Sequence, residues 1–536
     1  RGRNGAFSPG NNFRLQVLLA AGSCAGLDPV TTPSSLMPPA GGYRTIILTD
    51  FDRITGSQAE RDLLAARLAE LAAHPQVAGV VVDVGTDARV RAANQQADAS
   101  PECPPAKNQV AEAIKDIVDA YRALNPLEYV VIAGGDEVIP FKRYPDHALL
   151  ASERNYVPPV QDRTSSQASL RLGYVLNQDF YGASLELPYK NTSLPLPGLA
   201  VGRLVETPAE IAGMIEAFLQ AGGMAPAPSS LLVTGYDFLE DGARQIQQEL
   251  ESGSGVSADT LILPRELPPT HPSAWTADDL RQALLGQRHD LIFLAGHFSA
   301  SSALAADYTT RLLAEEVAAS SVDLRNSIIF SAGCHAGYNI VDPHGIPRVT
   351  REPDWAQAFA RKQATLIAGT GYQYGDTDFV EYSERLYLLF SRRLRTGSGP
   401  VSVGQALTAA KQDYLAGTPQ MRGIHHKVLL QTALFGLPML SVDMPGARLT
   451  PPGSTSIVPT PLNGYPADPG ATLGLQFADV QFSPALNTHS VELTDPSSGA
   501  AVTATYLSGP QGVLTGPAEP VLPLEVFNVG VPGTVL

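Results

Sequence analysis

Residues 290–334, DLIFLAGHFSASSALAADYTTRLLAEEVAASSVDLRNSIIFSAGC, decide how the fold of this chain is interpreted. Two short apolar runs, 290–296 and 327–333, are typical of buried strands, and RLLAEEVAAS between them (311–320) is helix-like. A strand, a helix and a second strand in this order place two parallel strands in one sheet. The stretch therefore predicts a βαβ unit.

Chemically active side chains follow both predicted strands at the same position. The first run ends in Ala-Gly before His297, and the second ends in Ala-Gly before Cys334. If the strands are neighbours, about 4.8 Å apart, their carboxyl ends emerge side by side, where open α/β sheets bind ligands. An imidazole can deprotonate a thiol and then protonate a leaving amine. We therefore predict a catalytic dyad of His297 and Cys334, with the backbone amides of Phe298 and Cys334 as oxyanion donors.

Two alternatives compete with this interpretation. Free cysteine is among the most buried residue types, so Cys334 alone could be a small core residue. The matched position of His297 favours catalysis instead. Cys334, His335 and His344 could also be assembled into a metal site, but their spacing fits no familiar zinc pattern, and we predict no metal site.

Alternating strand and helix patterns extend on both sides of this unit. Residues 43–223 form a first α/β series, which closes with a helix whose Thr207, Pro208 and Glu210 are typical of a capped helix start. Residues 224–444 form a second series, which contains the dyad. Apolar strands that alternate with helices predict mainly parallel sheets covered by helices. The fold class is therefore α/β, with two subdomains.

The ends of the chain have a different character. Residues 1–42 are rich in Pro, Gly and Ser and predict an irregular N-terminal segment. Within 445–536, prolines become dense and short alternating stretches replace the helical periodicity. This pattern predicts a small C-terminal β-sandwich.

Composition limits the classes of partner. The 536 residues carry a net charge of -16, with 53 acidic residues against 37 basic ones, which argues against nucleic acid. No run approaches the roughly 18 apolar residues that span a bilayer. The nearest run, 15–27, is short and resembles a lipoprotein signal ending at Cys24 only faintly.

The chain has three cysteines. Cys24 and Cys103 lie in Gly/Pro/Ser-rich surroundings and could form a disulfide, and two free thiols fit the sequence equally well. A disulfide would favour an extracellular or periplasmic location.

Several motifs together resemble the gingipain family within the caspase-like cysteine peptidases. Two of them surround the dyad, FLAGHFSAS (293–301) and FSAGCHAG (330–337). Four more motifs lie elsewhere in the chain, and all six occur in the family's order. They are YVVIAGGDEVIPFK (129–142), LNQDFYG (176–182), LAVGRLVETPAEI (199–211) and LFGLPML (434–440). The resemblance covers about 43–536 and implies two α/β subdomains, the second catalytic, followed by an immunoglobulin-like domain.

The resemblance also implies roles for two acids. Asp237 falls where the family has an acidic residue near its histidine. Asp241 falls near the acid that lies in the primary specificity pocket of arginine-specific members, so the substrate would have Arg or Lys before the cleaved bond. A neutral side chain would be rejected there, because a buried carboxylate would stay unpaired. Alternatively, Glu240 and Asp241 only mark a helix N-terminus, where acids are favoured.

Two positions depart from the family pattern: Phe298 replaces a small residue, and Leu437 replaces a common Asp. Neither removes the dyad.

We predict a secreted or cell-surface cysteine endopeptidase that acts on protein or peptide substrates. The alternatives are a catalytically degenerate scaffold for binding or assembly, and a transpeptidase of the sorting type. No cofactor is required, although the resemblance and the acidic composition are compatible with structural Ca²⁺.

Overall fold

The structure is a computed structural model that describes residues 24, 26–161, 164–450, 487–494, 500–508, 513–514 and 522–523. It divides into two compact units. The first comprises Arg1–Lys411 with Arg422–Leu449, and the second comprises Gln412–Met421 with Thr450–Leu536. Most of the signal-like run 15–27 lies outside the described residues.

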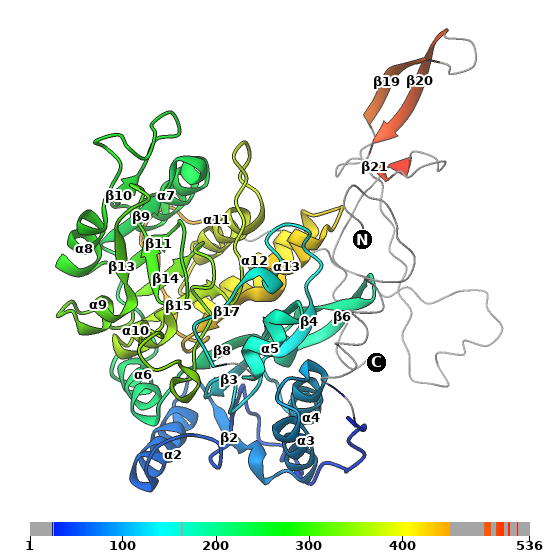
Figure 1. Ribbon diagram of the computed structural model, residues 1–536, viewed down its shortest axis with the longest axis vertical. Coiled ribbons are helices and arrows are strands. Elements are labelled where there is room, and N and C mark those ends of the chain that lie inside the picture. The colour runs from blue at the N-terminus through cyan, green and yellow to red at the C-terminus, as the bar shows by residue number, and fades with distance from the viewer. Residues whose placement is uncertain are drawn as a thin grey trace. The chain divides into compact units, whose positions relative to one another are not determined.

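A single ten-stranded sheet forms the centre of the first unit (Figure 1). Its strands follow the order β10-β9-β11-β14-β15-β17-β8-β3-β1-β2. Their bounds are β1 Thr45–Thr49, β2 Gly79–Asp83, β3 Tyr129–Ala133, β8 Ala200–Leu204, β9 Leu231–Gly235, β10 Asp259–Ile262, β11 Leu291–Leu294, β14 Ile328–Ser331, β15 Thr365–Gly369 and β17 Thr432–Phe435. All neighbouring pairs are parallel except β15 and β17. The mainly parallel sheet confirms the predicted α/β fold.

Both predicted α/β series contribute to this one sheet. The series 43–223 supplies β1, β2, β3 and β8, and the series 224–444 supplies the other strands. They meet where β17 pairs with β8, at Phe435 and Arg203. The sequence predicts the two series but not their fusion, because a strand of four residues does not reveal its partners.

Helices flank the sheet (Figure 1). They are α2 Gln58–Ala73, α3 Ala88–Ala99, α4 Pro104–Leu124, α5 Ser165–Arg171, α6 Pro208–Gln220, α7 Glu240–Ser254, α8 Ala277–Gly286, α9 Ala314–Ala319, α10 Trp355–Arg361, α11 Tyr382–Leu394, α12 Val403–Ala416 and α13 Gly423–Gln431. The predicted capping box of α6 is present, since the Glu210 amide donates to Thr207 Oγ1 and the Thr207 amide donates to Glu210 Oε2.

Short antiparallel pairs lie outside the main sheet. They are β4 Lys142–Pro145 with β5 Tyr174–Asn177, β6 Ala183–Tyr189 with β7 Thr192–Pro197, β12 Ser302–Leu304 with β13 Arg311–Leu313, and β16 Val401–Ser402 with β18 Ser441–Val442. The helix predicted over 311–320 is shorter than expected, because its first three residues form β13 and pair with β12.

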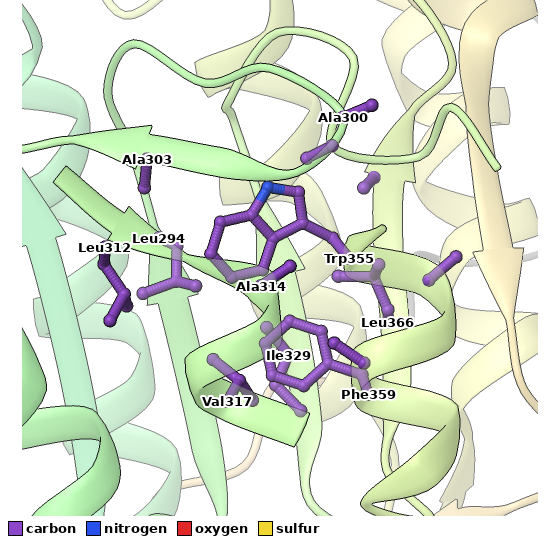
Figure 2. Close-up of a cluster of buried hydrophobic side chains, with 14 of the residues drawn as sticks. Leu294, Ala300, Ala303, Leu312, Ala314, Val317, Ile329, Trp355, Phe359 and Leu366 are labelled. Carbon is purple, nitrogen blue, oxygen red and sulfur yellow. The ribbon is translucent and has the colours of Figure 1, made fainter. Parts of the chain in front are cut away.

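Trp355, the first residue of α10, lies in a buried cluster with side chains of β11, β12 and α9 (Figure 2). Its indole is surrounded by aliphatic side chains that include Leu294, Ala303 and Ala314. The indole N–H donates to the Ser299 carbonyl at 3.0 Å, and the Trp355 amide donates to the Ala300 carbonyl at 3.0 Å. The core therefore fixes the chain that follows His297.

A disulfide joins Cys24 of the N-terminal segment to Cys103 at the start of α4. Cys24 and Cys103 are bonded, so of the two alternatives left by the sequence the structure has the disulfide. The carboxylate of Asp87 accepts hydrogen bonds from the amides of Ser35 and Leu36 at 2.7 and 3.0 Å. Within the described part of the chain, no helix is long and apolar enough to cross a membrane.

The described residues of the second unit include two antiparallel hairpins. Their strands are β19 Asn487–Thr494 with β20 Ala501–Ser508, and β21 Val513–Leu514 with β22 Leu522–Pro523. The β-sandwich predicted over 445–536 falls mostly outside the described residues.

Candidate active site

The dyad predicted from the sequence is delivered by two neighbouring strands. Strand β11 pairs in parallel with β14, from Leu291 opposite Ile328 to Leu294 opposite Ser331. His297 and Cys334 each follow three residues beyond the last paired position. Because the strands are parallel, both residues emerge at the same edge of the sheet, beyond its carboxyl ends.

The chain segments that carry the dyad also touch. A Cβ atom on Gly333 would lie 2.2 Å from Cγ of Phe298, so the Phe298 ring packs directly on the backbone before Cys334. The same ring lies 5.6 Å from the Trp355 ring, centroid to centroid. The Phe298 ring therefore occupies the space that the glycine leaves.

Cys334 is partly buried and is the free cysteine of the described residues. Its Sγ atom lies 3.7 Å from the carbonyl oxygen of Gln373. Burial raises the pKa of the thiol, and the negative charge of Glu153 raises it further, whereas the hydrogen bond at Gln373 and the charge of Lys427 lower it. The thiol therefore needs a base in order to become a nucleophile near neutral pH.

His297 is exposed at one side and surrounded by aromatic rings elsewhere. The ring centroids of Tyr236, Phe238 and Tyr308 lie 5.3, 5.3 and 5.5 Å from that of His297. This apolar setting lowers the pKa of the imidazole through desolvation, and the charge of Asp237 partly offsets the effect. The imidazole is therefore neutral at pH 7 and can accept a proton.

Asp237 lies in a 3-10 turn over Asp237–Leu239, just before α7. Its carboxylate bonds to the hydroxyl of Tyr308, which contributes to raising the pKa of Tyr308 to about 12 after the larger effect of burial. The charge of Asp237 reaches His297, but no hydrogen bond joins the two side chains in the described structure. The arrangement brings the acid within electrostatic range of the histidine.

The two predicted oxyanion donors have a suitable backbone arrangement. Phe298 and Ala303 form an antiparallel bridge. The hydrogen bond beside it runs from the Leu304 amide to the His297 carbonyl, at 2.9 Å, so Phe298 and Ala303 are a non-hydrogen-bonded pair. In such a pair the N–H of the central residue points away from the partner strand. Among the backbone hydrogen bonds of the described loops, none uses the amide of Phe298 or of Cys334 as donor.

Asp241 lies in the first turn of α7, close to a buried acid that the sequence analysis missed. Glu384 of α11 is 2% exposed, and a Cβ on Gly242 would lie 2.2 Å from its Oε1. Its Oε2 accepts from the Asp376 amide at 3.2 Å, and Oε1 has no partner among the described residues. Burial, with the charges of Asp241 and Asp376, raises the pKa of Glu384 to about 8. We call Asp241, Asp376 and Glu384 the acidic cluster.

One loop connects the acidic cluster with the thiol. The chain that follows β15 places the carbonyl of Gln373 against Cys334 Sγ, and two residues later a Cβ on Gly375 would lie 3.0 Å from Glu384 Oε2. Sequence reasoning missed Glu384 because SERLYLLF (383–390) has an ordinary amphipathic helix pattern, in which one acid carries no signal.

The residues considered for metal binding separate in the structure. His335 is buried and bonds to Glu153, whereas His344 lies 3.9 Å from Glu137. No group of three or more His, Cys, Asp or Glu side chains in the described residues is arranged to hold a metal ion. Structural Ca²⁺ stays a prediction from the resemblance.

Comparison with known proteins identifies the family of the chain. The profile of peptidase family C25 matches residues 46–443. No curated protein sequence matches the chain. Among solved structures, the complex of the pro- and mature domains of RgpB from Porphyromonas gingivalis aligns with a TM-score of 0.46 at 14% identity, over 74% of this chain and 79% of that one. The separase–securin complex of Saccharomyces cerevisiae aligns with a TM-score of 0.29 at 11% identity, over 46% of this chain and 14% of that one. The family profile spans most of the sequence, and the chain belongs to peptidase family C25, the gingipain family of cysteine peptidases.

Proposed function

We propose that this C25 peptidase is an endopeptidase in which Cys334 is the nucleophile and His297 the general base and acid. Membership of a peptidase family implies protein or peptide substrates. The observation that supports the two roles is the parallel pairing of β11 with β14, which brings both residues to one edge of the sheet.

The reaction follows from the chemistry of the two side chains. The neutral His297 takes the proton of the Cys334 thiol as the sulfur attacks the substrate carbonyl carbon. The amides of Phe298 and Cys334 donate to the resulting oxyanion. The imidazolium then protonates the leaving amine as the C–N bond breaks, which leaves a thioester. His297 next deprotonates a water molecule, which attacks the thioester and releases the acid and the thiol. Asp237 favours the imidazolium through its charge.

Hydrolysis of fluorogenic peptides tests this proposal. Peptides with Arg, Lys or Gln before the reporter amide are incubated with the protein and with its Cys334→Ala variant. We expect the variant to fall to the background rate, because it lacks the attacking sulfur. Equal signals from the two proteins would exclude thiol catalysis.

The acidic cluster supports a preference for a basic residue before the cleaved bond. With a pKa of about 8, Glu384 is mostly protonated at pH 7 when the cluster is empty. A bound guanidinium favours the ionised carboxyl, since an opposite charge lowers the pKa of an acid. Arginine side chains would therefore pair with Glu384 and Asp241, whereas neutral side chains would leave these acids unpaired.

Proton release on ligand binding is the expected signature of this pairing. Because binding of a cation lowers a pKa that lies above 7, benzamidine should release a fraction of a proton at pH 7, and its affinity should rise as the pH increases towards 8. Glu384→Gln should abolish the release and lower the affinity by about tenfold or more. Calorimetric titrations in two buffers with different ionisation enthalpies measure the proton count.

Asp378→Asn serves as the control for this titration. Asp378 is exposed, pairs with Arg265 at 2.7 Å and lies in the same loop as Asp376. Its variant should bind benzamidine and release protons like the unmodified protein. Unchanged proton release by Glu384→Gln would disprove the role of Glu384.

A binding or assembly module is the second candidate function. It is favoured by the raised pKa of Cys334 and by the Phe298 ring against Gly333. Rapid labelling of Cys334 by an arginine-directed electrophile would contradict a scaffold, whereas sluggish labelling would support it.

Addition of an amine to the peptidase assay, with mass analysis of the product, separates transpeptidation from hydrolysis.

We infer an extracellular or cell-surface location, which the bond between Cys24 and Cys103 supports, because disulfides persist in oxidising compartments. We also propose an immunoglobulin-like sandwich over 445–536 that mediates attachment, on the basis of the alternating sequence pattern.

A further inference from the structure

Four ionisable side chains lie buried together beside Cys334. They are Asp146, Glu153, His335 and Lys427, and their side chains are 0–1% exposed. We call them the buried network. Charged groups are costly to remove from water unless they are paired, so a cluster of this kind needs a structural explanation.

Lys427 of α13 joins the two acids of the network. Its Nζ atom lies 2.7 Å from Glu153 Oε1 and 3.0 Å from Asp146 Oδ2, and it donates to the Ala151 carbonyl at 2.9 Å. These three acceptors use all three donors of the ammonium group. Lys427 is therefore fully bonded and holds the segment 146–153 against α13.

Glu153 in turn holds the residue that follows the nucleophile. Its Oε2 lies 2.9 Å from His335 Nε2, and its Oε1 accepts from the Tyr372 amide at 2.8 Å. Burial favours the neutral acid, but the bond to His335 and the charge of Lys427 outweigh it and lower the pKa of Glu153. Since the carboxylate is ionised, Nε2 of His335 is the donor.

The His335 ring is clamped on its faces as well as at its edge. It stacks on the Tyr156 ring at a centroid distance of 3.4 Å and an interplanar angle of 12°, and Tyr372 meets it edge-on at 4.5 Å. Desolvation, together with the charge of Lys427, outweighs the effect of Glu153 and lowers the pKa of this imidazole, so the ring is neutral at pH 7. A ring held on three sides has one orientation.

The backbone of His335 has an unusual conformation. Its φ of 56° lies in the left-handed region, which is unfavourable for residues other than glycine. The turn directs the His335 amide to the Gly371 carbonyl at 2.8 Å, and the Gly337 amide to the Gly369 carbonyl at 2.8 Å. Side-chain contacts that fix His335 therefore also fix the direction of the Cys334 backbone.

The buried network is also close enough to act on the thiol. The charge of Glu153 raises the pKa of Cys334 and that of Lys427 lowers it. A negative charge on Cys334 would also raise the pKa of Tyr156 and of Tyr372, the two rings that contact His335. The thiol thus faces a set of charges that are fixed in place.

We propose that His335, held by Glu153 and Lys427, is a positioning residue that keeps the left-handed turn after Cys334 and thereby aims the Cys334 amide at the substrate oxyanion. This inference rests on the proposed function of Cys334 and adds to it a requirement for a neighbouring side chain that does not touch the substrate. Removal of the network leaves the sulfur in place but lets its amide move.

Paired substitutions at His335 test the positioning role. His335→Leu removes the donor to Glu153, whereas His335→Gln keeps a donor near the position of Nε2. We expect His335→Leu to lower kcat by about 10–100-fold with KM changed less than about 3-fold, because misplacement by about 1 Å is costly in rate. His335→Gln should restore kcat to within about 5-fold of the unmodified protein.

Alkylation of Cys334 gives a readout that does not depend on peptide hydrolysis. Since the other two cysteines form the disulfide, iodoacetamide modifies Cys334 alone. Glu153→Gln removes a charge that raises the thiol pKa, so the pH midpoint of alkylation should move down. If the unmodified protein is alkylated at Cys334 but cleaves no peptide, the proposed function fails, whereas an active protein whose His335→Leu variant keeps its full kcat overturns the positioning role alone.

His289→Gln is the matched control. His289 is also a buried histidine bonded to a carboxylate, with Nε2 3.0 Å from Asp259 Oδ2, but it precedes β11 at the opposite end of the sheet. This variant should retain the kcat and alkylation profile of the unmodified protein. Circular dichroism verifies that each variant is folded, and Glu153→Gln replaces His335→Leu if the latter does not fold. Profiles of the His335 and Glu153 variants that match that of His289→Gln would overturn the proposal.

Discussion

Replacement of His297 by alanine should lower kcat/KM for peptide hydrolysis by about 10²–10⁴-fold and leave the fold unchanged. Burial raises the pKa of Cys334, so little thiolate forms near neutral pH without the imidazole. The His297 side chain is exposed at the sheet edge, so its removal opens no cavity in the core. Steady-state kinetics with an arginine peptide and circular dichroism measure the two effects.

The pH profile separates the role of His297 from a loss of structure. Its pKa is lowered by desolvation, so the rate should fall on the acid side with a midpoint below 6.5, where the imidazole becomes protonated and cannot accept the thiol proton. His297→Ala should lack this acid limb. The double variant with Cys334→Ala should be no less active than Cys334→Ala alone, because the two side chains act in one step. A His297→Ala variant that keeps the full rate would refute the dyad.

Asp136→Asn should reduce the free energy of unfolding by about 3–5 kcal/mol. Asp136 pairs with Arg143 through two hydrogen bonds, of 2.8 and 2.5 Å, and the Arg143 side chain is 0% exposed. Burial would raise the pKa of Asp136, but the charge of Arg143 outweighs it and lowers the pKa. The contribution of the pair is therefore present above pH 3.8 and is lost as the pH falls through the lowered pKa. Urea unfolding at pH 7 measures the change.

Glu128→Gln is the control for this substitution. Glu128 also pairs with an arginine, Arg44, through two bonds of 2.9 and 2.7 Å, but both side chains are well exposed, at 37% and 42%. Water and salt screen exposed pairs, so we expect a loss of about 0–1 kcal/mol. Losses of equal size at the two sites would contradict the importance of burial.

The common sheet edge of His297 and Cys334 could be predicted because it depends on local order. An apolar strand, a crossover and a second apolar strand can form only a few topologies, and parallel neighbours carry their ends to one edge. His297 and Cys334 are both strand-end residues, so the pairing of β11 with β14 was within reach of the sequence. The same local logic located the capping box at Thr207.

The remaining parts of the site depend on contacts between distant segments. His335 bonds to Glu153, 182 positions away, and Lys427 bonds to Asp146, 281 positions away. Glu384 can be buried because Gly242 and Gly375, from two other segments, leave room for its carboxyl group. Neither periodicity nor motif spacing carries such information, because each residue looks ordinary in its own segment.

Strand β17 has a consequence for the order in which the protein is made. This strand hydrogen-bonds to β15 on one side and to β8 on the other, and α13 with Lys427 directly precedes it. A nascent chain on the ribosome therefore holds two half-sheets with open edges until residues 432–435 emerge. Only then does one continuous sheet form, so a polypeptide cut short before this point contains His297 and Cys334 but lacks the strand that joins the two half-sheets.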